Sequence, residues 1–201
     1  MARVLLFGGS FNPVHNGHLR LAVEALEQHA FDRVWLLPSG IPPHRQAYAQ
    51  EPEHRARMLE LAIQSHPDLE LCRHELDSSG VNYSYETVRS LSQSWPAHQF
   101  SFLTGMDVVY DYKWRNFDQL LEMVEHFLVA GRPGYDFSRL LEKLTGTPHL
   151  TKLSELKVPL HQVSSSMIRE RLKEGRSIHF WLPEPVRVYI ENQGIYSQNR
   201  Q

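Results

Sequence analysis

The stretch Gly8-Gly9-Ser10-Phe11-Asn12-Pro13-Val14-His15-Asn16-Gly17-His18-Leu19 decides the fold of this chain. It follows the apolar run Val4–Phe7, typical of a short buried strand, and precedes residues 20–28, whose apolar members recur at helical spacing. A glycine-rich turn between a strand and a helix directs backbone N–H groups to the helix N-terminus, where the peptide dipoles favour an anion. His15 and His18 lie on one face of the first helical turn. The stretch therefore predicts a polyphosphate site with two imidazole donors beside it.

Short apolar runs alternate with helical patterns along the rest of the chain. This alternation, with little polar alternation inside the runs, predicts an α/β fold: a Rossmann-like doubly wound parallel sheet with helices on both faces. We expect a single domain over residues 1–196 with a small C-terminal helical portion. A polar tail follows over residues 197–201, of which Gln198–Gln201 are expected to be disordered. The predicted strands are Arg3–Phe7, Arg33–Leu37, Leu69–Cys72, Gln99–Leu103, His126–Ala130 and Pro159–Val163. The predicted helices are Asn16–His29, Glu53–Ser65, Ser84–Ser94, Phe117–Glu125, Phe137–Lys143, Ser165–Lys173 and Pro185–Gln193, the last ending at a glycine typical of a C-cap.

Composition narrows the classes of partner. A net charge of −2 over 201 residues gives no basic footprint for nucleic acid. No apolar run approaches the roughly 20 residues of a membrane span, and the N-terminus shows no signal-peptide pattern. The single cysteine, Cys72, fits a reducing compartment. We expect a cytoplasmic protein without nucleic-acid or membrane partners; a homo-oligomer remains open.

Two familiar phosphate motifs are absent from the sequence. There is no G-x-x-x-x-G-K-[ST] loop, and Gly8-Gly9 does not extend to G-x-G-x-x-G. A P-loop kinase and an ordinary dinucleotide-binding dehydrogenase therefore lose support.

The segment from Gly8 to His18 resembles the H-x-G-H nucleotidyltransferases, with His15, Gly17 and His18 as the signature. Within that superfamily, G-G-S-F-N-P-V-H-x-G-H is similar to the bacterial nicotinate-nucleotide adenylyltransferases, whereas phosphopantetheine adenylyltransferases more often carry G-[ST]-F-D-P. Near the other end of the chain, residues 163–169 (V-S-S-S-M-I-R) resemble the second superfamily motif, I-S-S-T-x-I-R.

Four intermediate segments extend the resemblance. They are Ile41–Arg45 (I-P-P-H-R), Asn82–Thr87 (N-Y-S-Y-E-T), Gly105–Asp107 followed by Trp114, and Arg132–Tyr135 (R-P-G-Y). Ser84 and Glu86 stand where the family more often has Thr and Asp. These departures leave open a shift in the preferred pyridine nucleotide.

The resemblance implies attack by the 5′-phosphate of nicotinate mononucleotide on the α-phosphorus of ATP, which gives nicotinate adenine dinucleotide and pyrophosphate in NAD biosynthesis. A phosphate oxygen is already a nucleophile, so catalysis is mostly alignment and charge neutralisation. As catalytic residues, we assign His18 to the α-phosphate and the transition state, and His15 to orientation of the triphosphate. Donation would be stronger from protonated imidazoles. A metal half-site and two solvated histidines are the alternatives.

Candidate ligand contacts fall into two groups. The ATP group is Gly8, Gly9, Ser10, Phe11, His15, Gly17, His18, Gly105, Asp107, Ser164, Ser165, Ser166 and Arg169. The mononucleotide group is Asn12, His44, Arg45, Tyr83, Ser84, Trp114 and Arg132. We expect the helix that follows Ser164–Ser166 to hold phosphates at its N-terminus, although helix capping alone would explain the serines.

Individual roles in these groups each have a structural alternative. Asp107 is expected on the ribose hydroxyls, or at a helix N-cap. Trp114 is expected to stack on the pyridine ring, or to pack in the core. Tyr83 and Ser84 are expected on the nicotinate carboxylate. His44 and Arg45 would close over phosphate, or form an ordinary solvated loop.

No carboxylate cluster suggests a tight metal cage, so no protein metal site is expected and Mg²⁺ should arrive bound to ATP. Adenylylation of nicotinamide mononucleotide or of phosphopantetheine is the alternative activity. A nucleotide-binding regulator without catalysis is the alternative from another class.

Overall fold

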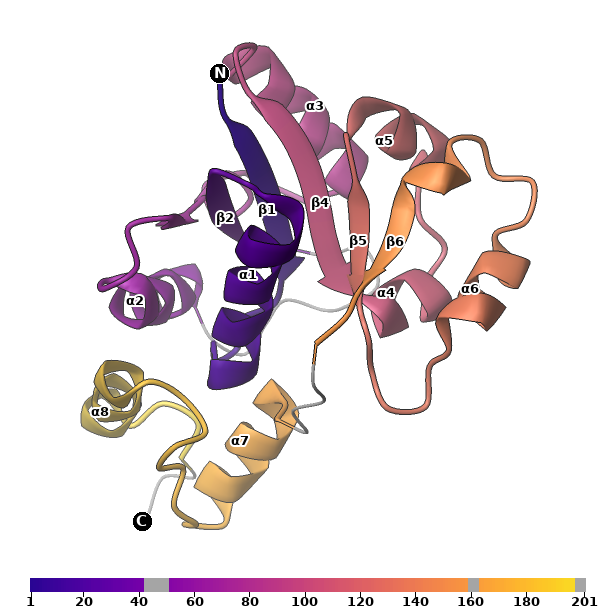
Figure 1. Ribbon diagram of the computed structural model, residues 1–201. Coiled ribbons are helices and arrows are strands. Elements are labelled where there is room, and N and C mark those ends of the chain that lie inside the picture. Colours follow the sequence, from indigo (N-terminus) through magenta and orange to yellow (C-terminus); the bar gives the residue numbers. More distant parts are fainter. Residues whose placement is uncertain (42–50, 159–162, 198–201) are drawn as a thin grey trace.

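The computed structural model describes residues 1–41, 51–158 and 163–197. Within these residues, six strands form one parallel sheet in the order β3-β2-β1-β4-β5-β6 (Figure 1). The strands are β1 (Arg3–Gly9), β2 (Arg33–Pro38), β3 (Leu69–Leu71), β4 (Gln99–Gly105), β5 (Phe127–Ala130) and β6 (Leu153–Leu156). The order runs outward from β1 and β4 in both directions, so the predicted doubly wound sheet is confirmed.

Helices cover both faces of the sheet. They are α1 (Asn16–His29), α2 (Pro52–Ile63), α3 (Ser84–Ser94), α4 (Met106–Asp111), α5 (Phe117–Met123), α6 (Phe137–Lys143), α7 (Ser165–Lys173) and α8 (Glu184–Gln193), with a short 3₁₀ helix at Leu150–Lys152. Buried side chains of α1, α2, α7 and α8 pack on one face, and those of α3 to α6 pack on the other. None of the described helices is long and apolar enough to cross a membrane.

Strand β1 shows why the apolar runs lack polar alternation. Leu5 and Phe7 belong to the core under α1 and α2, whereas Val4 and Leu6 belong to the opposite core. Successive side chains of a strand point to opposite faces, so a strand covered on both sides must be apolar throughout.

Most predicted elements agree with the structure to within two residues at each end, and the short 3₁₀ helix was not predicted. One strand and one α-helix differ further. The sixth strand is Leu153–Leu156, paired in parallel with β5, and not Pro159–Val163. Residues 159–162 lie outside the described part of the chain, and Val163 is not in a strand. An edge strand with two polar residues between its leucines gives a weak apolar signal, which explains the error. Helix α4 was not predicted, because its six residues start directly after β4 and include two β-branched valines. The tail, residues 198–201, lies outside the description.

The sheet positions the candidate site at the carboxyl ends of β1 and β4. These strands are neighbours, with Phe7 paired with Leu103 at the far end of their shared register. The chain leaves β1 for α1 on one face and leaves β4 for α4 on the other, so the connections diverge there. Ligands of open α/β sheets bind at such a switch point.

Candidate active site

The structure brings the two sequence motifs into direct contact. Ser165 Oγ donates a hydrogen bond of 2.8 Å to the Pro13 carbonyl oxygen, and Arg169 Nη1 donates one of 2.6 Å to the Asn12 carbonyl oxygen. The N-terminus of α7 is thereby fastened to the turn that connects β1 to α1. Segments from opposite ends of the chain form one site.

The two histidines of the turn form a stacked, buried pair. Their ring centroids are 3.6 Å apart with an interplanar angle of 22°, and His15 and His18 are 3% and 8% exposed. The backbone N–H of His15 donates to Nδ1 of His18 at 3.2 Å. Nδ1 of His18 is therefore an acceptor, so the neutral ring carries its proton on Nε2. That tautomer leaves Nε2–H of His18 as a donor for a ligand.

Aromatic side chains support His18 from behind. The Phe11 ring lies edge-on to the His18 ring at 4.9 Å between centroids, and Phe7 contacts Phe11 at 5.4 Å. Phe11 is fully buried and has a positive φ of 45°. The Phe11 side chain, expected among the ATP contacts, therefore lies in the core, where it fixes the orientation of His18.

Gly17 makes room for the His15 ring. A Cβ atom at position 17 would lie 3.0 Å from Nδ1 and 3.1 Å from Cε1 of His15. The glycine between the two histidines therefore permits the pair to stack. Gly17 also lines the smaller pocket, so the expectation that it keeps the helix start open for phosphate stays a prediction.

Burial keeps both imidazoles neutral in the free protein. Burial, with a further contribution from the Arg132 charge, lowers the pKa of His15 from 6.5 to about 3. Burial lowers the pKa of His18 as well, and His15 and Arg132 add to that effect. The pair donates as neutral rings unless a bound polyanion offsets these effects.

The lowered pKa of His15 predicts a pH dependence of stability. Because the unfolded chain binds the proton near pH 6.5 and the folded chain near 3, His15 stabilises the fold fully above pH 6.5, and this contribution is lost as the pH falls toward 3. When the pH falls from 7.5 to 5.5, the unfolding free energy of both proteins should decrease. We expect the decrease to be about 1.4 kcal/mol smaller for His15→Asn than for the wild type. Urea unfolding at both pH values measures this difference. Equal losses in the two proteins would contradict it.

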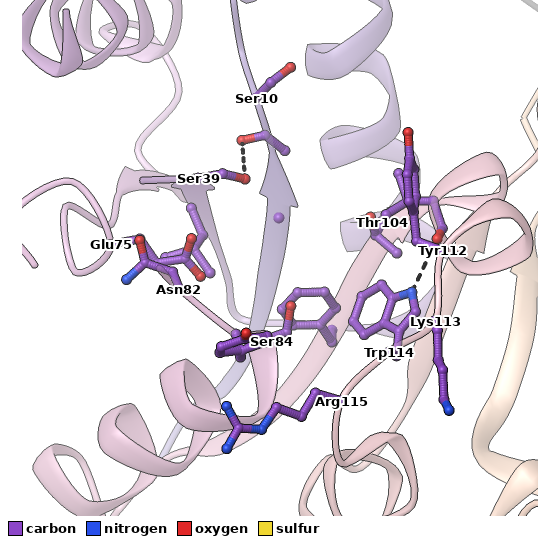
Figure 2. Close-up of a pocket in the computed structure, with 16 residues that line it drawn as sticks. Ser10, Ser39, Glu75, Asn82, Ser84, Thr104, Tyr112, Lys113, Trp114 and Arg115 are labelled. Atoms are coloured by element: carbon purple, nitrogen blue, oxygen red, sulfur yellow. Dashed lines mark hydrogen bonds between the residues drawn. The ribbon is translucent and has the colours of Figure 1, made fainter. Parts of the chain in front are cut away.

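Two pockets flank the turn. The smaller is lined by His15, Gly17, His18, Arg20, Leu21, Gly131, Arg132, Pro133, Val158 and Val163. The larger is lined by Gly8, Gly9, Ser10, Leu37, Ser39, Glu75, Asn82, Tyr83, Ser84, Phe102, Thr104, Val108, Tyr112, Lys113, Trp114 and Arg115. Figure 2 shows Glu75 and Asn82 on one side of the larger pocket and Trp114 on the other. The first glycines of the motif thus face one pocket and its histidines face the other.

Trp114, Tyr83 and Ser84, which were grouped as candidate mononucleotide contacts, all line the larger pocket. Trp114 is both a core residue and a lining residue: its Nε1–H donates to the Val108 carbonyl oxygen at 3.1 Å, and its ring packs edge-on against Phe102 (Figure 2). Tyr83 is the N-cap of α3 and Ser84 its first residue. Backbone N–H groups of the first turn of α3 have no partner within the helix, so they suit a carboxylate.

Arg132 lies apart from the residues with which it was grouped. It lines the smaller pocket with His15 and His18, and its Nε is 3.6 Å from Oδ1 of Asp107. Asp107 is in the first turn of α4 after the N-cap Gly105, so it is not itself the N-cap. A Cβ at Gly105 would lie 2.3 Å from Asp107 Oδ1, so this glycine allows the carboxylate to fold back toward the sheet.

Asn12 is buried and does not line the larger pocket. Its Oδ1 accepts a hydrogen bond from the hydroxyl of Tyr196, near the end of the described chain, and its carbonyl oxygen accepts from Arg169. The structure therefore places Asn12 between the turn and the C-terminal segment. His44 and Arg45, expected to close over phosphate, lie outside the described residues.

Helix α7 begins with a serine cap next to the β1–α1 turn. Ser164 is the N-cap, and its Oγ accepts from the Met167 N–H at 3.2 Å, so the capping alternative holds for this serine. Arg169 Nη2 donates to Ser166 Oγ at 3.0 Å. N–H groups in the first turn of a helix have no partner within the helix, and the Arg169 guanidinium has further N–H donors besides the two that bond to Asn12 and Ser166.

Sequence reasoning missed the polar residues that join the walls of the larger pocket. They are Ser39 after β2, Arg55 in α2, and Glu75 and Asn82 between β3 and α3. Arg55 gave a detectable signal, because it lies on the same helical face as Met58, Leu59 and Ala62, all buried. An arginine at an apolar position indicates a buried polar contact.

The side chains of this site are suited to bind phosphate oxygens and not to ligate a metal ion. Within residues 1–41, 51–158 and 163–197, no group of three or more His, Cys, Asp or Glu side chains is arranged to hold a metal ion. The groups around the turn are imidazoles, serine hydroxyls, Arg132 and Arg169, which suit phosphate oxygens.

This fold and site define a class. A parallel sheet with a glycine turn, paired imidazoles and an arginine-bearing helix terminus at its switch point is built for nucleotide phosphates. The model of the cytidylyltransferase-like family matches residues 6–171. The chain therefore belongs to the cytidylyltransferase-like nucleotidyltransferases and, as the comparisons with individual proteins show, to the nicotinate-nucleotide adenylyltransferases among them.

The assignment to the nicotinate-nucleotide adenylyltransferases rests on similar individual proteins. A nicotinate-nucleotide adenylyltransferase of Bacillus subtilis is 38% identical over 198 residues, which cover 98% of this chain and 99% of the relative. A Plasmodium falciparum nicotinic acid mononucleotide adenylyltransferase, solved in complex with NaAD, has a TM-score of 0.77 at 19% identity, with 98% of each chain covered. The same parasite enzyme in complex with APC has a TM-score of 0.75 at 19% identity, again with 98% of each chain covered. These two structures support the fold.

Proposed function

We propose that this protein transfers the adenylyl group of ATP to nicotinate mononucleotide, giving nicotinate adenine dinucleotide and pyrophosphate in NAD biosynthesis. The contact between the β1–α1 turn and α7 is the observation that carries the proposal. It brings the turn that carries His18, whose neutral ring has its proton on Nε2, against the helix terminus that carries Arg169. These donors would suit the anionic oxygens of a triphosphate.

The two pockets suit two ligands that meet at the turn. The smaller pocket, with His15, His18 and Arg132, lies on the side of α7 and suits the phosphates of ATP. The larger pocket offers an indole ring for a pyridine and the N-terminus of α3 for its carboxylate. Gly9 and Ser10, which line the larger pocket and precede the histidines in the turn, would contact the joined phosphates of the product.

The reaction needs alignment more than proton transfer. The mononucleotide phosphate attacks the α-phosphorus of ATP, the bond to the α,β-bridging oxygen breaks, and that oxygen leaves with pyrophosphate. His18 would donate its Nε2–H bond to an α-phosphate oxygen as charge develops in the transition state. His15, stacked on His18, would orient the triphosphate, and Arg169 would neutralise the leaving pyrophosphate. No side-chain nucleophile is required.

Magnesium enters this proposal as part of the substrate. Mg²⁺ bound to the ATP phosphates keeps several water ligands and needs few protein carboxylates. The donor set of the site fits that arrangement, because it contacts phosphate oxygens by hydrogen bonds. We place the reaction in the cytoplasm, a reducing compartment that suits the single cysteine, Cys72.

Pyrophosphate release from Mg-ATP tests the proposal when nicotinate mononucleotide, nicotinamide mononucleotide and phosphopantetheine are compared side by side. We expect a strong preference for nicotinate mononucleotide. Preference for the nicotinamide form would keep the mechanism and change the substrate. Turnover of phosphopantetheine alone, or of none of the three, would contradict the proposed function.

Trp114→Ala should raise the KM for the mononucleotide about 10-fold and leave the KM for ATP nearly unchanged, because stacking on the pyridine is lost. Trp114→Phe should lie in between, since it keeps a ring and loses the bond to the Val108 carbonyl oxygen. Initial rates with each substrate varied in turn measure both constants. Equal rises in the two KM values would assign Trp114 to packing alone.

A further inference from the structure

We propose that Arg55, Glu75 and Thr87 form a buried positioning network that sets the spacing between the phosphate turn and the pyridine wall of the larger pocket. The proposal rests on the proposed function, since the larger pocket is taken to bind the mononucleotide. These three residues act through the residues that they hold, so they are positioning residues and not catalytic ones.

Arg55 joins the ends of two neighbouring strands. It is 1% exposed, and its Nη1 donates to the Ser39 carbonyl oxygen at 2.6 Å and to the Ser10 carbonyl oxygen at 3.1 Å. Ser10 follows β1 and Ser39 follows β2, and both line the larger pocket (Figure 2). Ser39 also donates to the Gly9 carbonyl oxygen, from its N–H at 2.8 Å and from its Oγ at 3.2 Å. The Arg55 guanidinium therefore adds a bridge from α2 to two loops that already contact each other, and fixes both loops relative to that helix.

Glu75 joins the second loop to α3. Its Oε1 accepts from the Thr87 hydroxyl at 2.8 Å, and its Oε2 accepts from the Gly40 N–H at 3.3 Å. Thr87 lies three residues after Ser84, at the helix end proposed to bind the nicotinate carboxylate. Glu75 thus fixes the carboxylate end of the pocket relative to the loop that Arg55 holds.

Gly40 shows how closely these walls are packed. A Cβ at this position would lie 2.2 Å from Asn82 Oδ1 and 2.3 Å from the Glu75 carbonyl oxygen. Asn82 Oδ1 also accepts from the Ile41 N–H at 3.1 Å. The loop after β2 has no room to move toward Glu75, so a change in the network is transmitted to the pocket wall.

The energetics argue against a purely stabilising role. Burial raises the pKa of the Glu75 carboxyl, which the Thr87 and Gly40 hydrogen bonds and the Arg55 charge oppose. Taking charged groups out of water is costly, and well-packed apolar residues often stabilise such positions as well or better. Position 55 lies on the apolar face of α2, where a methionine or leucine would pack. The arginine therefore serves the geometry of the loops.

The first test compares Thr87→Val with Thr87→Ser. Valine has nearly the same shape and lacks the hydroxyl that Glu75 accepts, whereas serine keeps it. We expect Thr87→Val to raise the KM for nicotinate mononucleotide about fivefold, with kcat and the KM for ATP within twofold of the wild type. Thr87→Ser should restore the wild-type KM. Calorimetric binding of nicotinate mononucleotide without ATP should show the same order.

The second test uses Arg55→Lys, which keeps the charge and replaces the planar guanidinium, whose Nη1 reaches both carbonyl oxygens, with a flexible ammonium group. We expect its KM for nicotinate mononucleotide to rise about 10-fold, again with little change for ATP. Arg57→Met is the matched control, because Arg57 is two residues along α2, half-exposed, and pairs with Glu60 at 2.9 Å. It should behave as the wild type.

The double variant Arg55→Met with Glu75→Gln leaves no uncompensated buried charge, so it should fold even if Arg55→Lys does not. We expect it to keep the raised KM for the mononucleotide. A wild-type KM in the double variant or in Thr87→Val, or equal rises for both substrates, would overturn the proposed network. If the wild type itself turns over no nicotinate mononucleotide, the proposed function fails instead.

Discussion

His18→Ala should lower kcat by roughly 10²- to 10³-fold while the KM for each substrate changes little, because a donor to the α-phosphate acts mainly in the transition state. The structure gives the reason for choosing this residue. The His15 N–H bonds to one nitrogen of His18, the His15 ring stacks on it and the Phe11 ring packs edge-on to it, so the Nε2–H of His18 is fixed in direction before substrate binds. Steady-state rates of pyrophosphate release measure the effect.

Folding must be separated from catalysis in this variant, since His18 is buried among aromatic rings. Near-ultraviolet circular dichroism and the unfolding midpoint report whether the core persists. His29→Ala, which removes the histidine at the other end of α1, is the control and should keep wild-type kcat. Turnover of folded His18→Ala at the wild-type rate would remove His18 from the mechanism.

Arg169→Met should lower kcat/KM for ATP about 10- to 100-fold, the effect of losing a charged hydrogen bond to phosphate. Part of the loss should come from a displaced α7, because Arg169 also bonds this helix to the Asn12 carbonyl oxygen. Arg169→Lys should recover only part of the activity, since an ammonium group cannot make both the Asn12 and the Ser166 bonds with one planar fork.

Lys173→Gln removes a positive charge from the exposed surface of the same helix and serves as the control. Rates with ATP varied at saturating nicotinate mononucleotide give the comparison. An Arg169→Met enzyme with the same kcat/KM for ATP as Lys173→Gln would show that the helix terminus holds the phosphates without the guanidinium.

The local sequence pattern was sufficient to predict those elements whose signal lies in neighbouring residues. The apolar run of β1, the glycine turn and the helical spacing of α1 predicted a strand, a turn and a helix, and the structure has all three. The doubly wound sheet followed from the same alternation of strands and helices. Strand β6 was not predicted because two of its four residues are polar. Helix α4 was not predicted because its two valines have a higher propensity for strands than for helices.

The site was predictable as two motifs and not as one arrangement. Spacing along the chain could not show that Ser165 reaches Pro13, or that Arg132 lies beside the histidines and away from Trp114. The contacts of Arg55 and Glu75 depend on loops from three separate crossovers. Such contacts arise only when the sheet is assembled, which is why Glu75 gave no signal in the sequence.

Because the turn after β1 meets α7, the order of synthesis bears on activity. A ribosome delivers the two histidines among the first 18 residues and Arg169 only after some 150 more. Any chain that stops before α7 lacks the helix terminus, the arginine and the two bonds that hold the turn from the C-terminal side. Under the proposed mechanism, a chain shortened before α7 would therefore keep both histidines and lose the groups assigned to the leaving pyrophosphate.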